Sequence, residues 1–159
     1  NRRNNTLVIT ERTDSRRESI TEVTVCFTTL TDISIAKADV TIEGVIDTQL
    51  LDIEISNESH LIAEIDVLDL YLTASGQSCI VLSGSTRYQT VDISTAEYDA
   101  SNLESVSCVA TSSHSAKVTI DATERLECRT NTGGEIKYNS TPMILRTEIT
   151  LFGGEITQM

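Results

Sequence analysis

The chain has four cysteines, at positions 26, 79, 108 and 128. The spacing between them indicates whether they could bind a metal. No two of them form a C-x-x-C pair, and no histidine lies at the spacing of a structural zinc site. We therefore expect no metal and no cofactor. Cys108 and Cys128 are 20 residues apart. They are either buried free thiols that fill a core or, in an oxidising compartment, a Cys108–Cys128 disulfide.

The two histidines, His60 and His114, both have serine neighbours, but serine is so frequent here that this proximity predicts little. A nucleophilic serine needs a base beside it and a defined strand-turn-helix setting. The stretch Gly76-Gln-Ser78-Cys-Ile follows a G-x-S-x-G elbow until its fifth position, where Ile80 replaces glycine. We therefore expect no nucleophilic catalysis and no enzyme.

Carboxylates are dense between residues 18 and 86, where twelve acids accompany a single base, Lys37. An enzyme acting on acidic polysaccharides would need paired carboxylates at a defined separation and bases that hold the sugar. The bases are missing, so we interpret the acids as solvated outward positions and keep a polysaccharide-active enzyme as the alternative. The acids concerned are Asp47, Asp52, Glu54, Glu58, Glu64, Asp66 and Asp69.

Aromatic side chains are few, with four tyrosines, two phenylalanines and no tryptophan. Tyr71 alternates with Leu70 and Leu72 and is expected to point outward, and Tyr88 stands beside Arg87. Tyr71, Arg87 and Tyr88 are therefore the candidate contact residues for a partner. Tyr98 and Tyr138 occupy apolar positions and are expected in the core.

The elements that must position these residues are β-strands. Thr (23), Ile (17) and Val (11) together make up 51 of 159 residues, and β-branched side chains favour a pleated surface. Apolar and other residues alternate with period 2, as in residues 51–55, 70–74 and 118–120. No stretch has the 3.6-residue period of a capped helix. The sequence predicts an all-β protein.

Charge is distributed unevenly along the chain, which has 24 acidic and 12 basic residues and a net charge of −12. Residues 1–17 carry +3, residues 18–86 carry −11 and residues 87–159 carry −4. The acid excess argues against a nucleic-acid partner. No apolar run reaches about 18 residues, so we expect no membrane span in this chain. It begins at Asn1 without a signal peptide, and we interpret it as a processed or trimmed fragment.

A repeat of 18 to 20 residues underlies the alternation. It appears in a column of polar or small residues, 57, 76, 94, 113 and 132, and in a small-residue column, 59, 78, 96, 115 and 134. Two apolar columns follow at 61, 80, 98, 118 and 136 and at 63, 82, 100, 120 and 138. This step leaves no room for crossover helices. It predicts a parallel solenoid of five coils, roughly 24 Å long at about 4.8 Å per coil.

The stretch from Val40 to Pro142 resembles the putative auto-transporter adhesin "head GIN" domain family of bacteria. The residues that carry the resemblance are 72–78, 99–103, 116–126 and 133–142. The resemblance implies a right-handed, single-stranded parallel β-helix, export to the periplasm or outer surface of a Gram-negative bacterium, and an adhesive role. The family usually has glycine in the turn column, where this chain has Asn57, Ser94, Ser113 and Thr132. We therefore expect that the bends cannot all use positive φ.

Together these observations predict an N-terminal arm with a cap or first coil (1–35), β-helix coils (36–142) and a C-terminal strand or cap (143–159). The preferred function is a non-enzymatic exported or cell-surface module that binds a surface glycan or protein. The alternatives are the polysaccharide-active enzyme and a purely structural envelope module.

Overall fold

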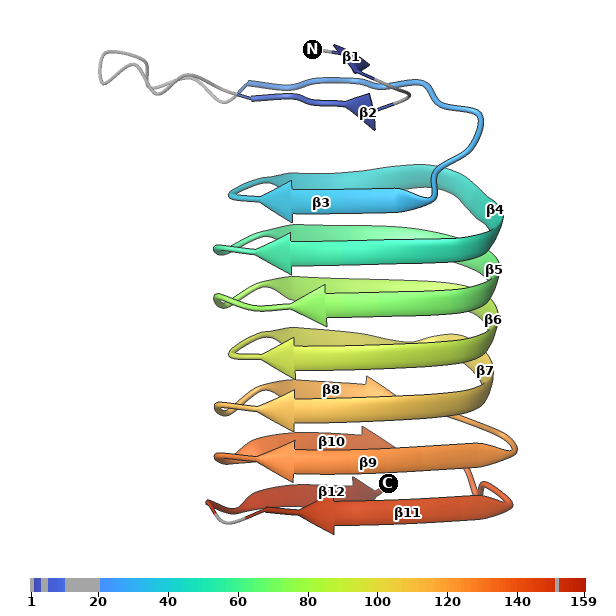
Figure 1. Ribbon diagram of the computed structural model, residues 1–159, viewed down its shortest axis with the longest axis vertical. Helices are drawn as coiled ribbons and strands as arrows, with labels where there is room; N and C mark the ends of the chain where they lie inside the picture. The colour runs from blue at the N-terminus through green and yellow to red at the C-terminus, as the bar shows by residue number, and fades with distance from the viewer. Residues whose placement is uncertain (1, 4–5, 11–20, 151) are drawn as a thin grey trace.

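The computed structural model describes residues 2–3, 6–10, 21–150 and 152–159 and is a right-handed parallel β-helix (Figure 1). Successive coils stack from the N-terminal to the C-terminal end of a rod, as the repeat and the family resemblance predicted. The strands are β1 (Arg2–Arg3), β2 (Thr6–Leu7), β3 (Asp32–Ala36), β4 (Asp39–Ser56), β5 (His60–Ala74), β6 (Cys79–Ser94), β7 (Glu97–Ser113), β8 (Lys117–Ile120), β9 (Arg125–Asn131), β10 (Gly134–Tyr138), β11 (Ile144–Ile149) and β12 (Gly154–Gln158).

Each coil contributes one arm to each of two sheets, which we name by their place in Figure 1. The front sheet contains β3, the second halves of β4, β5, β6 and β7, and then β9 and β11. The back sheet contains the first halves of β4 to β7, and then β8, β10 and β12. All these pairings are parallel. Strands β4 to β7 are long because each bends from the back sheet into the front sheet without interruption.

The stack has about seven coils among the described residues, so the prediction of five was too low. The extra coils come from β3 with the start of β4, and from β11 with β12. The repeat columns miss them because the end coils place less regular residues at those positions. Residues 143–159, predicted as a C-terminal strand or cap, thus contain the last coil of the stack.

The core consists of ladders of inward side chains that repeat once per coil. The first predicted apolar column is confirmed, because Leu61, Ile80, Tyr98, Val118 and Ile136 pair in register and are all buried. Alternation explains why the column keeps its character, since every second residue of each arm faces the interior. The small-residue column needs one correction. At its fourth position the inward residue is Ala116, while Ser115 is exposed.

One ladder of the front sheet runs the whole length of the rod, and we call it the Ile35–Ile149 ladder. Its inward residues pair in register from the first coil to the last, and they include both apolar and hydroxyl side chains. Its members are Ile35, Ile55, Ala74, Ile93, Ser112, Thr130 and Ile149.

The bends that join the front sheet back to the back sheet contradict the expectation about positive φ. Every one of these bends from Lys37 to Gly153 contains at least one residue with positive φ, and Thr132 adopts a φ of 51°. Only some of the residues with positive φ are glycines, for example Gly76, which has a φ of 68°. Backbone hydrogen bonds between neighbouring bends hold the strained residues, for example from Ser115 N–H to the Thr132 carbonyl at 3.1 Å. Bonds from one coil to the next thus impose a conformation that the residue types alone disfavour.

The N-terminal segment lies across the first coil (Figure 1). Strands β1 and β2 form a short antiparallel pair, and residues 21–31 lead from the arm into β3. Leu30 packs against the core at this end. Most of the basic arm predicted over residues 1–17 lies outside the described residues. Among the residues that the structure describes, no helix is long and apolar enough to cross a membrane.

Candidate binding surface

A groove of about 740 Å³ follows the bend between the back and front sheets, parallel to the axis of the rod. It crosses five coils because each coil contributes the same few bend residues to it. The buried residues Val67, Thr86 and Ser105 form its floor. The residues that line it are 47–49, 66–68, 85–87, 104–106 and 123. An elongated hollow of this kind suits an extended ligand better than a compact one.

One wall of the groove is an outward ladder of polar side chains. Asp47, Asp66, Ser85 and Glu104 pair in register from β4 to β7. The Ser85 hydroxyl donates a hydrogen bond to Asp66 Oδ1 at 2.7 Å, which orients this carboxylate. The wall therefore presents carboxylates and a hydroxyl about 4.8 Å apart, the spacing of neighbouring strands.

The opposite wall carries Arg87, the one basic residue among the described residues that line the groove. Its guanidinium carbon lies 5.7 Å from the centre of the Tyr88 ring, within the range of a cation–π contact. The groove is thus acidic overall, with one positive charge beside an aromatic ring.

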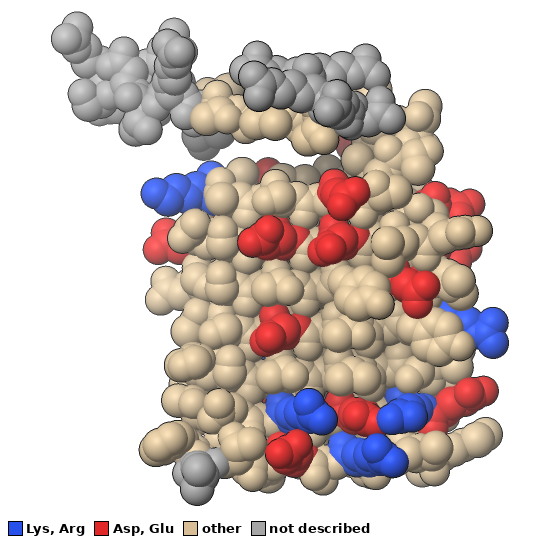
Figure 2. All heavy atoms as spheres, viewed as in Figure 1, with Lys and Arg blue, Asp and Glu red and all other residues tan. Residues whose placement is uncertain are grey.

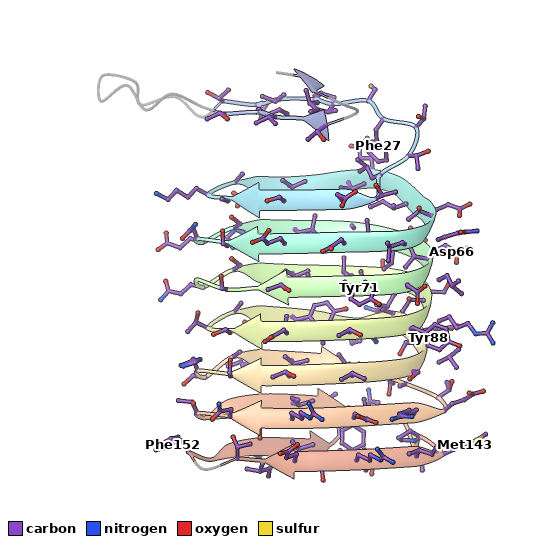
Figure 3. All side chains as sticks on the ribbon, viewed as in Figure 1. Phe27, Asp66, Tyr71, Tyr88, Met143 and Phe152 are labelled. Carbon is purple, nitrogen blue, oxygen red and sulfur yellow. The ribbon has the colours of Figure 1, made fainter. Side chains whose placement is uncertain are left out.

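Tyr71 completes this region from the neighbouring strand. In register, Asp69 of β5 faces Tyr88 of β6 and Tyr71 faces Thr90, so the tyrosines lie two positions apart on adjacent strands. The two tyrosine residues are 48% and 46% exposed, and both lie on the front sheet (Figure 3). The structure therefore brings together on one surface the three residues that the sequence singled out, Tyr71, Arg87 and Tyr88. We call them the Arg–Tyr patch.

A buried polar network that the sequence did not indicate lies behind the groove. Gln89 occupies a core position and accepts a hydrogen bond from the Tyr98 hydroxyl at 3.3 Å. Its amide nitrogen donates to Ser105 Oγ at 2.9 Å, and Ser105 donates to the Asp121 carbonyl. A satisfied network of this kind fixes the backbone around it. Hence the floor of the groove at Ser105 is rigid, and Tyr98 is a core residue as predicted.

The cysteines divide into an outer and an inner pair, and all four are free thiols in the structure. Cys108 and Cys128 are buried, and burial raises the pKa of Cys128 to about 12 and that of Cys108 well above its ordinary value. In register Cys108 faces Leu126, while Cys128 faces Ala110, so the two thiols belong to adjacent ladders. The Cys108–Cys128 disulfide gains no support from this register and stays a prediction.

The histidines lie on exposed surface outside the groove. His60 Nδ1 is 2.6 Å from Asp39 Oδ1, and Cys79 follows His60 in the same ladder. Burial and the neighbouring Glu97 and Asp99 raise the pKa of Cys79, so its thiol stays protonated instead of forming a nucleophile. Nor is Ser78 free to react, because it is buried and its hydroxyl donates to the Ser75 carbonyl at 2.7 Å.

The carboxyl groups whose pKa is displaced lie away from the groove. Hydrogen bonding from Arg125 lowers the pKa of Glu127, and hydrogen bonding from Lys137 lowers that of Glu135. A general acid requires a raised pKa, so neither group fits that role. No group of three or more His, Cys, Asp or Glu within the described ranges is arranged to hold a metal.

The front sheet also changes its charge along the rod (Figure 2). Outward positions near the N-terminal end carry acids, as at Asp52 and Glu54, and positions near the C-terminal end carry arginines paired with glutamates. Between them lie Tyr71, a single acid at Asp92 of β6, and mostly neutral residues. The uneven charge predicted from the sequence thus appears on a single face as an acidic half and an ion-paired half.

Comparison with known proteins bears on the family and the fold. The family profile described as "putative auto-transporter adhesin, head GIN domain" matches residues 1–142. No curated protein matches this chain. The crystal structure of a putative adhesin from Bacteroides fragilis is similar, with a TM-score of 0.72 and 24% sequence identity over 76% of this chain. The match spans 56% of that protein's chain, and at this identity the likeness concerns the fold.

Proposed function

This chain belongs to the family described as "putative auto-transporter adhesin, head GIN domain", and from that premise we propose that it is a non-enzymatic binding module of the bacterial cell envelope. Its ligand lies along the groove and against the Arg–Tyr patch. The proposal includes export to the periplasm or the outer surface of a Gram-negative cell, as the adhesin family name suggests.

The observation that carries this proposal is the position of Tyr71, Arg87 and Tyr88 beside an open groove that crosses five coils. Exposed aromatic rings stack on the apolar faces of sugars or on peptide side chains, and arginine donates several hydrogen bonds from a fixed plane. The hydroxyls and carboxylates of the opposite wall accept and donate further hydrogen bonds. This combination suits an elongated polar ligand held by one side.

The charge of the groove narrows the class of ligand. Asp47, Asp66 and Glu104 line it together with Arg87 alone among basic residues, and the whole chain carries −12. Such a field repels polyanions and admits neutral or positively charged chains. We therefore propose a neutral or amine-bearing glycan, or a basic extended peptide of a surface protein, as the ligand.

A glycan array that includes neutral, amine-bearing and uronate-rich chains, read together with adhesion to glycan-coated beads, tests the proposal. Binding should be confined to the neutral and amine-bearing chains, and Tyr88→Ala and Arg87→Ala should each lower affinity about tenfold or more. Arg129→Ala, an exposed arginine of β9 away from the groove, is the matched control and should bind as the unaltered protein does. Equal binding by all three variants would contradict the assignment of the surface.

The same glycans distinguish a binding module from the alternative, a polysaccharide-active enzyme. Asp47 and Asp66 lie in register on the groove wall and are the carboxylates that such an enzyme would use. Bound glycan recovered after prolonged incubation should keep its length. Shortened chains, lost in Asp66→Asn, would overturn the non-enzymatic proposal.

A further inference from the structure

The last coil leaves one edge of the front sheet unpaired. Strand β11 pairs with β9 on one side, and no strand of the described part of the chain lies on its other side. The inward residues Leu145 and Ile149 are 43% and 56% exposed there. Unpaired edges with apolar side chains are templates for another strand.

The direction of the backbone groups along β11 follows from two hydrogen bonds. Ile144 N–H donates to the Glu124 carbonyl at 2.8 Å, and Thr150 N–H donates to the Thr130 carbonyl at 3.0 Å. Backbone groups of a strand point alternately to its two sides, so residues with even numbers face β9. Leu145, Thr147 and Ile149 therefore aim their N–H and carbonyl groups at the free edge.

The side chains of β11 are complementary to those of a second β11 that runs in the opposite direction. In an antiparallel pair centred on Thr147, that residue faces its own copy and Leu145 faces Ile149 of the other molecule. These are the residues whose backbone groups point to the edge, so each pair exchanges both of its hydrogen bonds. Side chains opposite one another share a face, so the apolar pairs continue the core of both rods.

The outward positions add matched charges. In the same register Arg146 faces Glu148 of the other molecule, and Glu148 faces the other Arg146. Within one chain, Arg146 Nη1 lies 3.6 Å from Glu127 Oε1 and Glu148 Oε2 lies 3.2 Å from Arg129 Nε. The intermolecular pairs would join these into one network on the front sheet. A slip by one residue would place inward side chains opposite outward ones, and a slip by two would place Arg146 or Glu148 opposite its own copy, so the pattern favours this register.

We propose that a second copy of this chain occupies this edge, which gives a two-fold symmetric dimer of β-helices joined at their C-terminal ends. An isologous contact of this kind uses the same strand from both partners and closes after two molecules. The two rods then share one continuous front sheet, and each presents its own Arg–Tyr patch. The proposal does not depend on the proposed function, because it rests on β11 alone.

The test is sedimentation velocity over a concentration series, with charge variants of β11. The unaltered protein should change from monomer to dimer as concentration rises. Arg146→Glu and Glu148→Arg each place like charges across both outward pairs, so each should weaken self-association about tenfold or more. Mixed together, these two variants oppose glutamate to arginine again and should form a heterodimer. No merely structural effect of either substitution predicts this rescue.

Ile149→Lys supplies a second measurement, because an inward charge at an edge blocks strand addition. It should remain a monomer at every concentration with an unchanged circular dichroism spectrum. A protein that stays monomeric throughout the series, or single variants that dimerise as well as the unaltered chain, would overturn the proposal. Failure of glycan binding would leave this result untouched, since the groove and β11 are altered separately.

Discussion

At one end of the rod the Ile35–Ile149 ladder is covered, and at the other end it is open. Ile35 is 6% exposed, and Leu30 packs against the core on its side, whereas Ile149 is 56% exposed. The two residues have the same type, the same inward direction and the same ladder, so the difference comes from what lies beyond them. At the N-terminal end Leu30, in the segment that leads into β3, packs against the core, whereas at the C-terminal end the apolar edge of β11 is exposed. The repeat therefore specifies the residues of the middle coils of this solenoid but not those of its end coils.

The largest expected effect concerns access to the cysteines along the rod. Cys26 is exposed in the N-terminal arm, while Cys108 and Cys128 are buried in the coils, where burial raises their pKa. Because alkylation requires an accessible thiolate, the inner pair should react at least about 100-fold more slowly than Cys26 in the folded protein. Timed alkylation with peptide mass spectrometry measures this ratio.

Alkylation of the unfolded protein without reductant then decides the disulfide prediction. Four modified cysteines are expected. Two unmodified residues at 108 and 128 would instead show a bridge, and fast labelling of either in the folded state would contradict their burial.

The next effect tests the two ends directly through a pair of matched substitutions. Ile35→Ala removes a buried side chain and should lower the free energy of unfolding by about 2–4 kcal/mol. Ile149→Ala removes a mostly exposed one and should cost less than about 1 kcal/mol. Both are measured by chemical denaturation at concentrations low enough to keep the protein monomeric. Equal losses would show that the two ends are covered alike.

A smaller effect, a gain in stability instead of a loss, is expected from a substitution one coil inside the open end. Thr130 Oγ1 is buried and has no hydrogen-bond partner among the described residues. Thr130→Val keeps the volume and removes the unpaired hydroxyl, so it should raise the free energy of unfolding by about 1 kcal/mol. Thermal and chemical denaturation measure the gain.

The control for this substitution lies in the same ladder. Ser112 donates a hydrogen bond to the Ala116 carbonyl at 2.9 Å, so Ser112→Ala should lower stability by a similar amount. A loss of stability in Thr130→Val would mean that its hydroxyl has a partner.

The smallest effect is a pH dependence confined to the C-terminal coils. Because Arg125 lowers the pKa of Glu127 in the folded protein, the unfolded chain binds its proton first as pH falls. The stabilisation is therefore complete at pH values above the ordinary glutamate pKa of about 4.3. It is lost as pH falls through the lower pKa that Glu127 has in the folded protein. The unaltered protein should melt higher than Glu127→Gln at pH 5, and the gap should narrow at pH 3 and in high salt. A gap independent of pH would exclude the ion pair as its source.

Much of the fold was predictable because stacking imposes a residue type on each inward position. The column from Leu61 to Ile136 and the outward direction of Tyr71 are confirmed for this reason. The positive φ at Thr132 was not predictable, since hydrogen bonds to the next coil impose it. Nor was Gln89 in the core, because its partners lie in β7 and in the segment that follows β8.

The end coils and the groove also lay beyond the sequence pattern. The inward column that holds Cys128 ends in Thr147, so the apolar signal fades where the stack stops. The groove depends on how far the bend side chains of five successive coils extend. The spacing of the repeat shows that the bends align, but it does not show the shape of the surface that their side chains form. The candidate residues could thus be named from the sequence, while the surface that unites them could not.

The difference between the two ends is tested most directly by amide hydrogen exchange of β3 and β11 at low and high protein concentration. In dilute solution the edge amides of residues 145, 147 and 149 should exchange rapidly, whereas the amides of residues 33 and 35, which point to β4, should exchange slowly. At high concentration the β11 amides should become protected, and β3 should not change. Protection of β11 that is the same at both concentrations, or its absence at both, would contradict an edge that a second copy of the chain covers.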